Sequence, residues 1–152
     1  MDEVTVQQED FSPEQMQAEL TGGSRNIGAL ATFVGLVREG SEPIQYMELE
    51  HYPGMTERSI QEIIDEARNR WDVQSARVVH RVGRLQPGEQ IVYVGVSSRH
   101  RGDAFAACEF IMDYLKTRAP FWKKEVSENG QSWVDARESD LVAARRWNSS
   151  LK

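Results

Sequence analysis

The stretch ARVVHRVGRLQPGEQIVYVGVSS, residues 76–98, decides the fold class that the sequence predicts. Two runs rich in valine, 76–85 and 90–98, flank the tetrapeptide Gln86-Pro87-Gly88-Glu89. Proline followed by glycine suits the two central positions of a type II turn. The stretch therefore predicts a β-hairpin, and with it a sheet that is mainly antiparallel.

On both sides of the hairpin, apolar residues recur at helical spacing. We expect Thr56 to cap the helix that precedes the hairpin. The apolar face of this helix is formed by Ile60, Ile63, Ile64, Ala67 and Trp71. The following helix, which we expect Asp103 to cap, ends near residue 118 because Pro120 cannot continue it. Its inner face is formed by Ala104, Ala107, Cys108, Ile111, Met112 and Leu115.

The rest of the chain alternates between further strands and one short helix. Ser12-Pro13 predicts the start of a helix that ends near residue 20. The expected strands are a short edge strand in 2–8, a buried strand at 27–38, a half-exposed strand at 45–52, and extended segments at 121–125 and 132–134. A polar tail follows from about residue 138. The expected fold is a single α+β domain, residues 1–152, with a mainly antiparallel sheet and packed helices.

Composition excludes several classes of function. With 18 basic and 24 acidic residues, the chain has a formal net charge of −6, which argues against a general binder of nucleic acid or anionic membranes. It contains no apolar run long enough to span a membrane and no signal-like N-terminus. Its single cysteine, Cys108, excludes an internal disulfide and a multi-cysteine metal site. We expect a cytoplasmic protein.

A cluster of cations in an otherwise acidic chain is the first candidate site. The segment DYLKTRAPFWKKE, residues 113–125, places Lys116 one turn past Met112, beside the apolar face of the predicted helix. Partial desolvation there would lower the pKa of the lysine toward a useful acid–base range. Lys123 and Lys124 face opposite sides of an extended segment, so only one of them can share a pocket with Lys116. The alternative is that cations at a helix end simply complement the helix dipole.

The segment SRHRGD, residues 98–103, is the second candidate, at a junction between a strand and a helix. A helix N-terminus offers free N–H groups, and Arg99, His100 and Arg101 add positive charge, which suits a phosphate. The alternative is a solvated turn whose arginines pair with carboxylates, and the sequence leaves both interpretations open. Arg38, at a strand end, could likewise reach a cleft or cap the surface.

The remaining candidates favour structural roles. His51 and His80 lack partners at metal-ligand spacing, so each predicts a structural hydrogen bond. Cys108 falls in the middle of a helix on its apolar side, which predicts a buried and unreactive thiol.

Seven segments in order closely resemble the large, catalytic subunit of molybdopterin synthase, over about residues 27–147. They are FVGLVR, LEHYPGMTE, EARNRW, VVHRVG, PGEQIVYVGVSSRHR, FIMDYLKTRAPFWKKE and WVDARESD. The resemblance implies an α/β hammerhead fold. It also implies an enzyme, a sulfurtransferase that makes molybdopterin by inserting two sulfurs into cyclic pyranopterin monophosphate, with no permanently bound cofactor.

The resemblance further implies a protein partner. The sulfur arrives as a thiocarboxylate at the C-terminal Gly-Gly of a small ubiquitin-like subunit, whose tail enters a pocket of the large subunit. Two large subunits form a central homodimer within a heterotetramer. A chain whose only cysteine is buried agrees with this, since it needs a carrier to supply sulfur.

The family's functional positions map onto this sequence one by one. Lys116 and Lys123 are the implied catalytic pair. The implied substrate-binding residues are these two lysines together with Arg38, His100, Arg101, Met112, Glu125 and Arg137. We expect His100 and Arg101 to come from the neighbouring subunit.

One departure concerns Leu36, which is apolar where relatives often carry a lysine or another polar residue. The resemblance therefore gives less reason to expect a side-chain contact from this position, although its backbone could still serve. Two other functions remain open at this point. One is an enzyme that handles phosphoesters without a protein partner, and the other is a non-catalytic scaffold that docks a ubiquitin-like protein.

Overall fold

A computed structural model describes residues 3–40, 42–134 and 138–150 of the chain. In these residues, eight strands form two four-stranded sheets, three α-helices pack on the first sheet, and a fourth α-helix packs on one of those helices. The first sheet has the order β1-β4-β6-β2, with β1 (Val4–Gln7), β4 (Ser75–Arg81), β6 (Gln90–Ser98) and β2 (Ala29–Leu36). The second has the order β5-β3-β7-β8, with β5 (Gly83–Leu85), β3 (Tyr46–His51), β7 (Phe121–Ser127) and β8 (Gly130–Val134). Among the strands of the described residues, only β1 and β4 pair in parallel, which confirms the α+β prediction.

The predicted hairpin forms, but its first strand is divided between the two sheets. β4 pairs antiparallel with β6, with His80 opposite Val92, and the Glu89 N–H donates to the Gln86 carbonyl in the turn. Gly83 has a φ of 88°, a conformation that favours glycine, and beyond it the chain enters β5 of the second sheet. The prediction of one strand over 76–85 was therefore wrong at this glycine.

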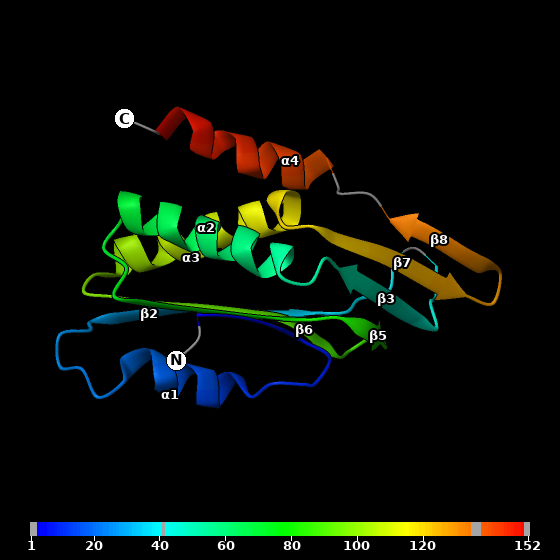
Figure 1. Cartoon of the computed structure of the whole chain (residues 1–152), viewed down its shortest axis with the longest axis horizontal. Coiled ribbons are helices and arrows are strands. Elements are labelled where there is room, and N and C mark those ends of the chain that lie inside the picture. The colour runs from blue at the N-terminus through cyan, green and yellow to red at the C-terminus, as the bar shows by residue number, and fades with distance from the viewer. Residues whose placement is uncertain (1–2, 41, 135–137, 151–152) are drawn as a thin grey trace.

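The helices cover both faces of the first sheet (Figure 1). Helices α2 (Met55–Arg70) and α3 (Arg101–Arg118) lie on one face, and α1 (Pro13–Thr21) lies on the other. The main core, between the sheet and α2 and α3, contains the predicted apolar faces of both helices, including Ile60, Ile64 and Ile111. The second sheet extends beyond the C-terminal end of α3, where β7 begins.

Both predicted helix caps lie one or more residues inside their helices. Gly54 precedes α2, and its N–H donates to the Glu57 carboxylate at 3.0 Å. The Thr56 hydroxyl instead donates to the Pro120 carbonyl at 2.9 Å, which ties the start of α2 to the start of β7. His100 is the N-cap of α3, while the Asp103 carboxylate accepts from the Asp72 N–H at 2.9 Å.

Two other segments differ from expectation. β2 is an edge strand rather than a buried one, with Phe33 42% and Leu36 56% exposed. The polar tail forms α4 (Glu138–Arg145) and a 3₁₀ turn (Arg146–Ser150). The Trp147 ring packs edge-on against Phe110, at 5.5 Å between centroids, which holds this segment on α3.

Candidate active site

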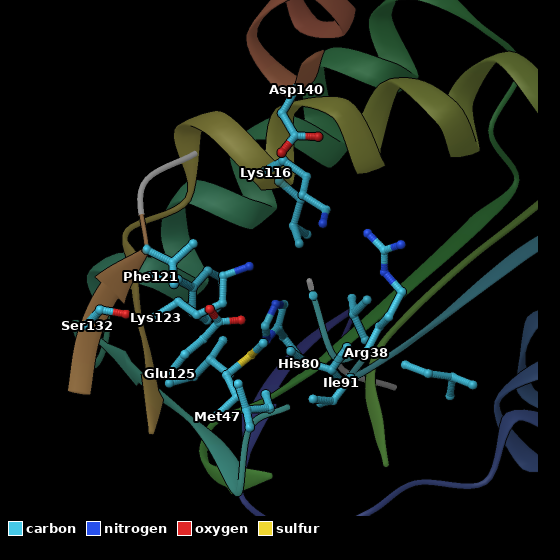
Figure 2. A pocket seen from close by; sticks show the side chains of 18 of the residues that line it. Arg38, Met47, His80, Ile91, Lys116, Phe121, Lys123, Glu125, Ser132 and Asp140 are labelled. Atoms are coloured by element: carbon cyan, nitrogen blue, oxygen red, sulfur yellow. The ribbon is translucent and has the colours of Figure 1, made fainter. Parts of the chain in front are cut away.

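The candidate site is a cavity of about 520 Å³ where the end of α3, the start of β7 and the segment after β2 meet. Pro120 ends α3 and turns the chain into β7, so side chains from two different elements enter one space. Figure 2 shows Lys116, from the last turn of α3, and Lys123, from β7, both directed toward this space. Arg38, which follows β2, approaches it from another side.

The register of β7 explains which lysine enters the cavity. Lys123 pairs with Leu49 and Glu125 with Met47, and all four residues line the cavity. Lys124 lies on the opposite face, where its ammonium contacts the Glu48 carboxylate at 3.0 Å. The structure thus brings Lys123 together with Lys116 and leaves Lys124 in a surface ion pair.

The cavity holds both signs of charge. Its cations are Arg38, Lys116 and Lys123, and its carboxylates are Glu42, Glu125 and Asp140. Lys116 is exposed to solvent, so the expected desolvation of this lysine does not occur in the single chain. Apolar side chains such as Met47, Met112 and Leu115 form part of the wall. Such an arrangement can bind an anion and exchange protons with a bound molecule.

The other end of α3 is a separate region. Lys116 comes fifteen positions after Arg101, which is about 22 Å along the axis at about 1.5 Å per residue. His100 and Arg101 are exposed and do not line the cavity. The Arg99 guanidinium contacts Asp72 at 3.0 and 3.1 Å, and these hydrogen bonds lower the pKa of the Asp72 carboxyl to about 2. Arg99 therefore pairs with a carboxylate at the surface, which is the alternative to a phosphate site that the sequence left open.

The expected residues do not all meet in one place. Arg38, Met112, Lys116, Lys123 and Glu125 line the same cavity. Arg137 lies outside the described residues, so its predicted role stays a prediction.

Cys108 has the surroundings that the sequence predicts. Its thiol is buried and lies 3.8 Å from the Val94 carbonyl oxygen. Burial raises the pKa of this thiol to about 12, so it is protonated at neutral pH and a poor nucleophile.

Sequence reasoning missed several polar side chains of the cavity, among them His80 and Asp140. His80 was expected to make a structural hydrogen bond, and its Nδ1 does lie 2.8 Å from the Arg81 carbonyl oxygen. The same ring also lines the cavity (Figure 2). Asp140 comes from α4, in the tail for which no helix was predicted.

The described residues lack two features. No group of three or more His, Cys, Asp or Glu side chains in them is arranged to hold a metal ion. None of the helices in this part of the chain combines the length and apolarity that crossing a membrane requires.

Comparisons with known proteins agree on one family. The model of the MoaE protein family matches residues 6–118. The molybdopterin synthase catalytic subunit of Vibrio cholerae is 57% identical over 146 residues, covering 95% of this chain and 97% of that protein. A molybdopterin biosynthesis MoaE protein from Burkholderia ambifaria is 52% identical with a TM-score of 0.84, covering 97% of this chain and 99% of that one.

A more distant solved structure shares the fold. It is a protein–protein complex of subunits 1 and 2 of the molybdopterin-converting factor from Helicobacter pylori. The matching chain is 20% identical with a TM-score of 0.73, and the match covers 90% of this chain and 92% of that one. With the family model covering most of the sequence and relatives above 50% identity, this chain belongs to the MoaE family.

Proposed function

We propose that this protein is the catalytic subunit of a molybdopterin synthase. It transfers sulfur from the C-terminal thiocarboxylate of a small ubiquitin-like subunit to cyclic pyranopterin monophosphate, which becomes the dithiolene of molybdopterin. The observation that carries this proposal is the convergence of Lys116 and Lys123 on one cavity, from a helix end and a strand that the family motif joins. Membership of the MoaE family supports the proposal, as does the similarity to a protein named molybdopterin synthase catalytic subunit.

The chemistry assigns a role to each lysine. Attack of a thiocarboxylate sulfur on the pyranopterin produces anionic intermediates, which nearby ammonium groups stabilise. Lys116 is the exposed one of the pair and exchanges protons with the reacting groups, while the half-buried Lys123 holds a carboxylate of the partner or substrate. Arg38 binds the phosphate, and Met112, Glu125 and Arg137 complete the contacts with the substrate.

An external source of sulfur follows from the state of Cys108. A thiol with a pKa of about 12, buried in the core, cannot easily carry a persulfide to the cavity. A partner that delivers a thiocarboxylate on a flexible Gly-Gly tail solves this problem. The complex of two subunits solved for the Helicobacter pylori protein agrees with a small partner.

His100 and Arg101 reach a cavity only if a second copy of the chain provides them. Their distance of about 22 Å from Lys116 along α3 prevents a contribution to the same cavity. β2 is an edge strand with exposed apolar side chains, which suits a contact between two large subunits. We therefore propose a central homodimer with one small subunit at each end, in the cytoplasm and without a permanently bound cofactor.

One experiment separates this function from its two alternatives. The protein is mixed with a thiocarboxylated small subunit and cyclic pyranopterin monophosphate, and the product is followed by mass spectrometry. We expect a product that has gained two sulfurs, only when all three components are present. Turnover of the pyranopterin without the partner would indicate a phosphoester-handling enzyme, and binding of the partner without any turnover would indicate a scaffold.

A further inference from the structure

His80 is a buried histidine whose ring faces the candidate active site. It lies near the end of β4, opposite Val92, and is only 6% exposed. Both residues line the cavity. In the view of Figure 2 its ring lies below Lys116 and between Lys123 and Arg38. The roles proposed above do not use this side chain.

Two contacts fix the orientation of the ring. Nδ1 lies 2.8 Å from the Arg81 carbonyl oxygen, and because a carbonyl can only accept, Nδ1 must carry a proton. The ring also stacks on Phe121, with 3.9 Å between centroids and 22° between the planes. Phe121 begins β7 two residues before Lys123, so the same strand that supplies the lysine also positions the imidazole.

The carbonyl that accepts from Nδ1 is itself rigidly placed. The Arg81 side chain is buried, and its guanidinium donates to the backbone carbonyls of Gln8 and Gln90, each at 3.0 Å. Its neighbour Val82 donates its N–H to the Gln7 carbonyl at 2.9 Å. The end of β4 is thus held from both sides, so the tautomer of His80 is set by the fold.

With Nδ1 protonated in a neutral ring, Nε2 carries a lone pair. Among the described residues, no side chain or backbone group donates a hydrogen bond to it. Burial, together with the positive charges of Lys116 and Lys123 and the nearby His51, lowers the pKa of the imidazole to about 4. Nε2 is therefore an uncharged acceptor at neutral pH, beside three cations that suit anionic groups.

An uncharged acceptor recognises a different chemical group from the one that the cations recognise. A phosphate or carboxylate oxygen would face the lone pair of Nε2 without a proton between them, which is unfavourable. An N–H or O–H group would satisfy it, and a pterin ring system carries N–H donors. A ligand with a phosphate at one end and such donors at the other would be oriented by both.

We propose that His80 is a substrate-binding residue of this pocket, with Nε2 accepting a hydrogen bond from an N–H or O–H group of the pyranopterin. This inference rests on the proposed function. In it, Arg38 binds the phosphate of the substrate, and His80 binds the donor-bearing ring. The two contacts together place the substrate beside Lys116, and they discriminate against phosphates that lack a ring donor.

Two substitutions separate the acceptor from the structural role of the ring. In His80→Asn the amide nitrogen can replace Nδ1 as the donor to Arg81, but no atom remains at the position of Nε2. In His80→Gln the amide oxygen can reach that position and accept. The dissociation constant of cyclic pyranopterin monophosphate is measured by calorimetry for the complex with unsulfurated small subunit, and KM and kcat are measured in the complete reaction.

We expect His80→Asn to weaken pyranopterin binding about tenfold, as loss of one hydrogen bond does, and His80→Gln to stay within about threefold of wild type. Affinity for the small subunit should not change in either variant. Equal binding by wild type and His80→Asn would overturn the inference, as would equal weakening in both variants, or a loss confined to the small subunit. If wild type itself makes no product, the proposed function fails instead.

A measurement on the unaltered protein covers the case in which a variant does not fold. The chain has three histidines, so nitrogen NMR of protein labelled at histidine can resolve the Nε2 signal of His80. We expect this signal to move upfield when cyclic pyranopterin monophosphate is added, as it does when an unprotonated nitrogen accepts a hydrogen bond. Inorganic phosphate, the matched control, should leave it in place, and an unmoved signal with the pyranopterin would overturn the inference.

Discussion

The two ends of helix α3 carry similar positive charge and differ in their surroundings. At the N-terminal end, Arg99 is held by Asp72, and His100 and Arg101 are exposed. At the C-terminal end, Lys116 faces a cavity that the second sheet and the segment after β2 enclose. The sequence offered both clusters as candidates for an anion site. The comparison shows that the surrounding elements, rather than local charge alone, decide whether a cation lines a cavity.

The largest expected effect tests the C-terminal end directly. We expect Lys116→Ala to reduce product formation about 1,000-fold, because it removes the group that stabilises charge and exchanges protons with the reacting atoms. Folding and binding of the small subunit should stay near wild type, which thermal melting and calorimetry check. Arg99→Ala, at the other end of the helix, serves as the control and should retain activity. Near-normal turnover by Lys116→Ala would contradict the assignment.

The next effect concerns stability and involves His80. The folded state lowers the pKa of this histidine from 6.5 to about 4, so below pH 6.5 the unfolded chain binds the proton more strongly. The contribution of His80 to the free energy of unfolding is therefore fully present above pH 6.5 and is lost as the pH falls toward 4. The loss amounts to about 3 kcal/mol, because each pKa unit is worth about 1.4 kcal/mol. We expect the free energy of unfolding of wild type to fall by this amount relative to His80→Gln, and parallel curves would contradict the expectation.

A smaller effect uses the two adjacent lysines of β7. We expect Lys123→Ala to reduce kcat/KM by about 10- to 100-fold, because its ammonium faces the cavity. Lys124→Ala changes the same residue type one position away, on the face where Lys124 contacts Glu48, and should stay within about threefold of wild type. Comparable losses of kcat/KM in the two variants would show that activity depends on positive charge near the strand and not on the direction of the side chain.

The smallest effect belongs to the N-terminal end of α3. The pKa of Asp72 is lowered from 3.8 to about 2 by Arg99, so its contribution to stability is present above pH 4 and is lost as the pH falls toward 2. We expect the carboxyl signal of Asp72 to titrate near pH 2 in wild type and closer to pH 4 in Arg99→Ala, as followed by NMR. The pair is on the surface, so Arg99→Ala should shift the melting temperature only slightly. An unchanged titration would show that the Arg99 pair does not form in solution.

The amino-acid sequence by itself determined most of the local structure and part of the site. Helical spacing identified the buried faces of α2 and α3, and Pro87-Gly88 identified the hairpin turn. Alternation along β7 predicted that only one of two adjacent lysines could join Lys116. These features depend on contacts between residues that are close in the chain, which is why a pattern of residues reports them.

Only the tertiary structure decided how these elements combine. It divided the strand at Gly83 between two sheets, placed β2 at an edge, and brought Asp140 of α4 and His80 of β4 to the same cavity as Lys116. The sequence around His80 predicts an ordinary structural histidine, because nothing in VVHRVG shows that Phe121 and Lys123 lie beside it. Pairing between distant segments sets those neighbours, and such pairing depends on the packing of the whole chain rather than on any local period.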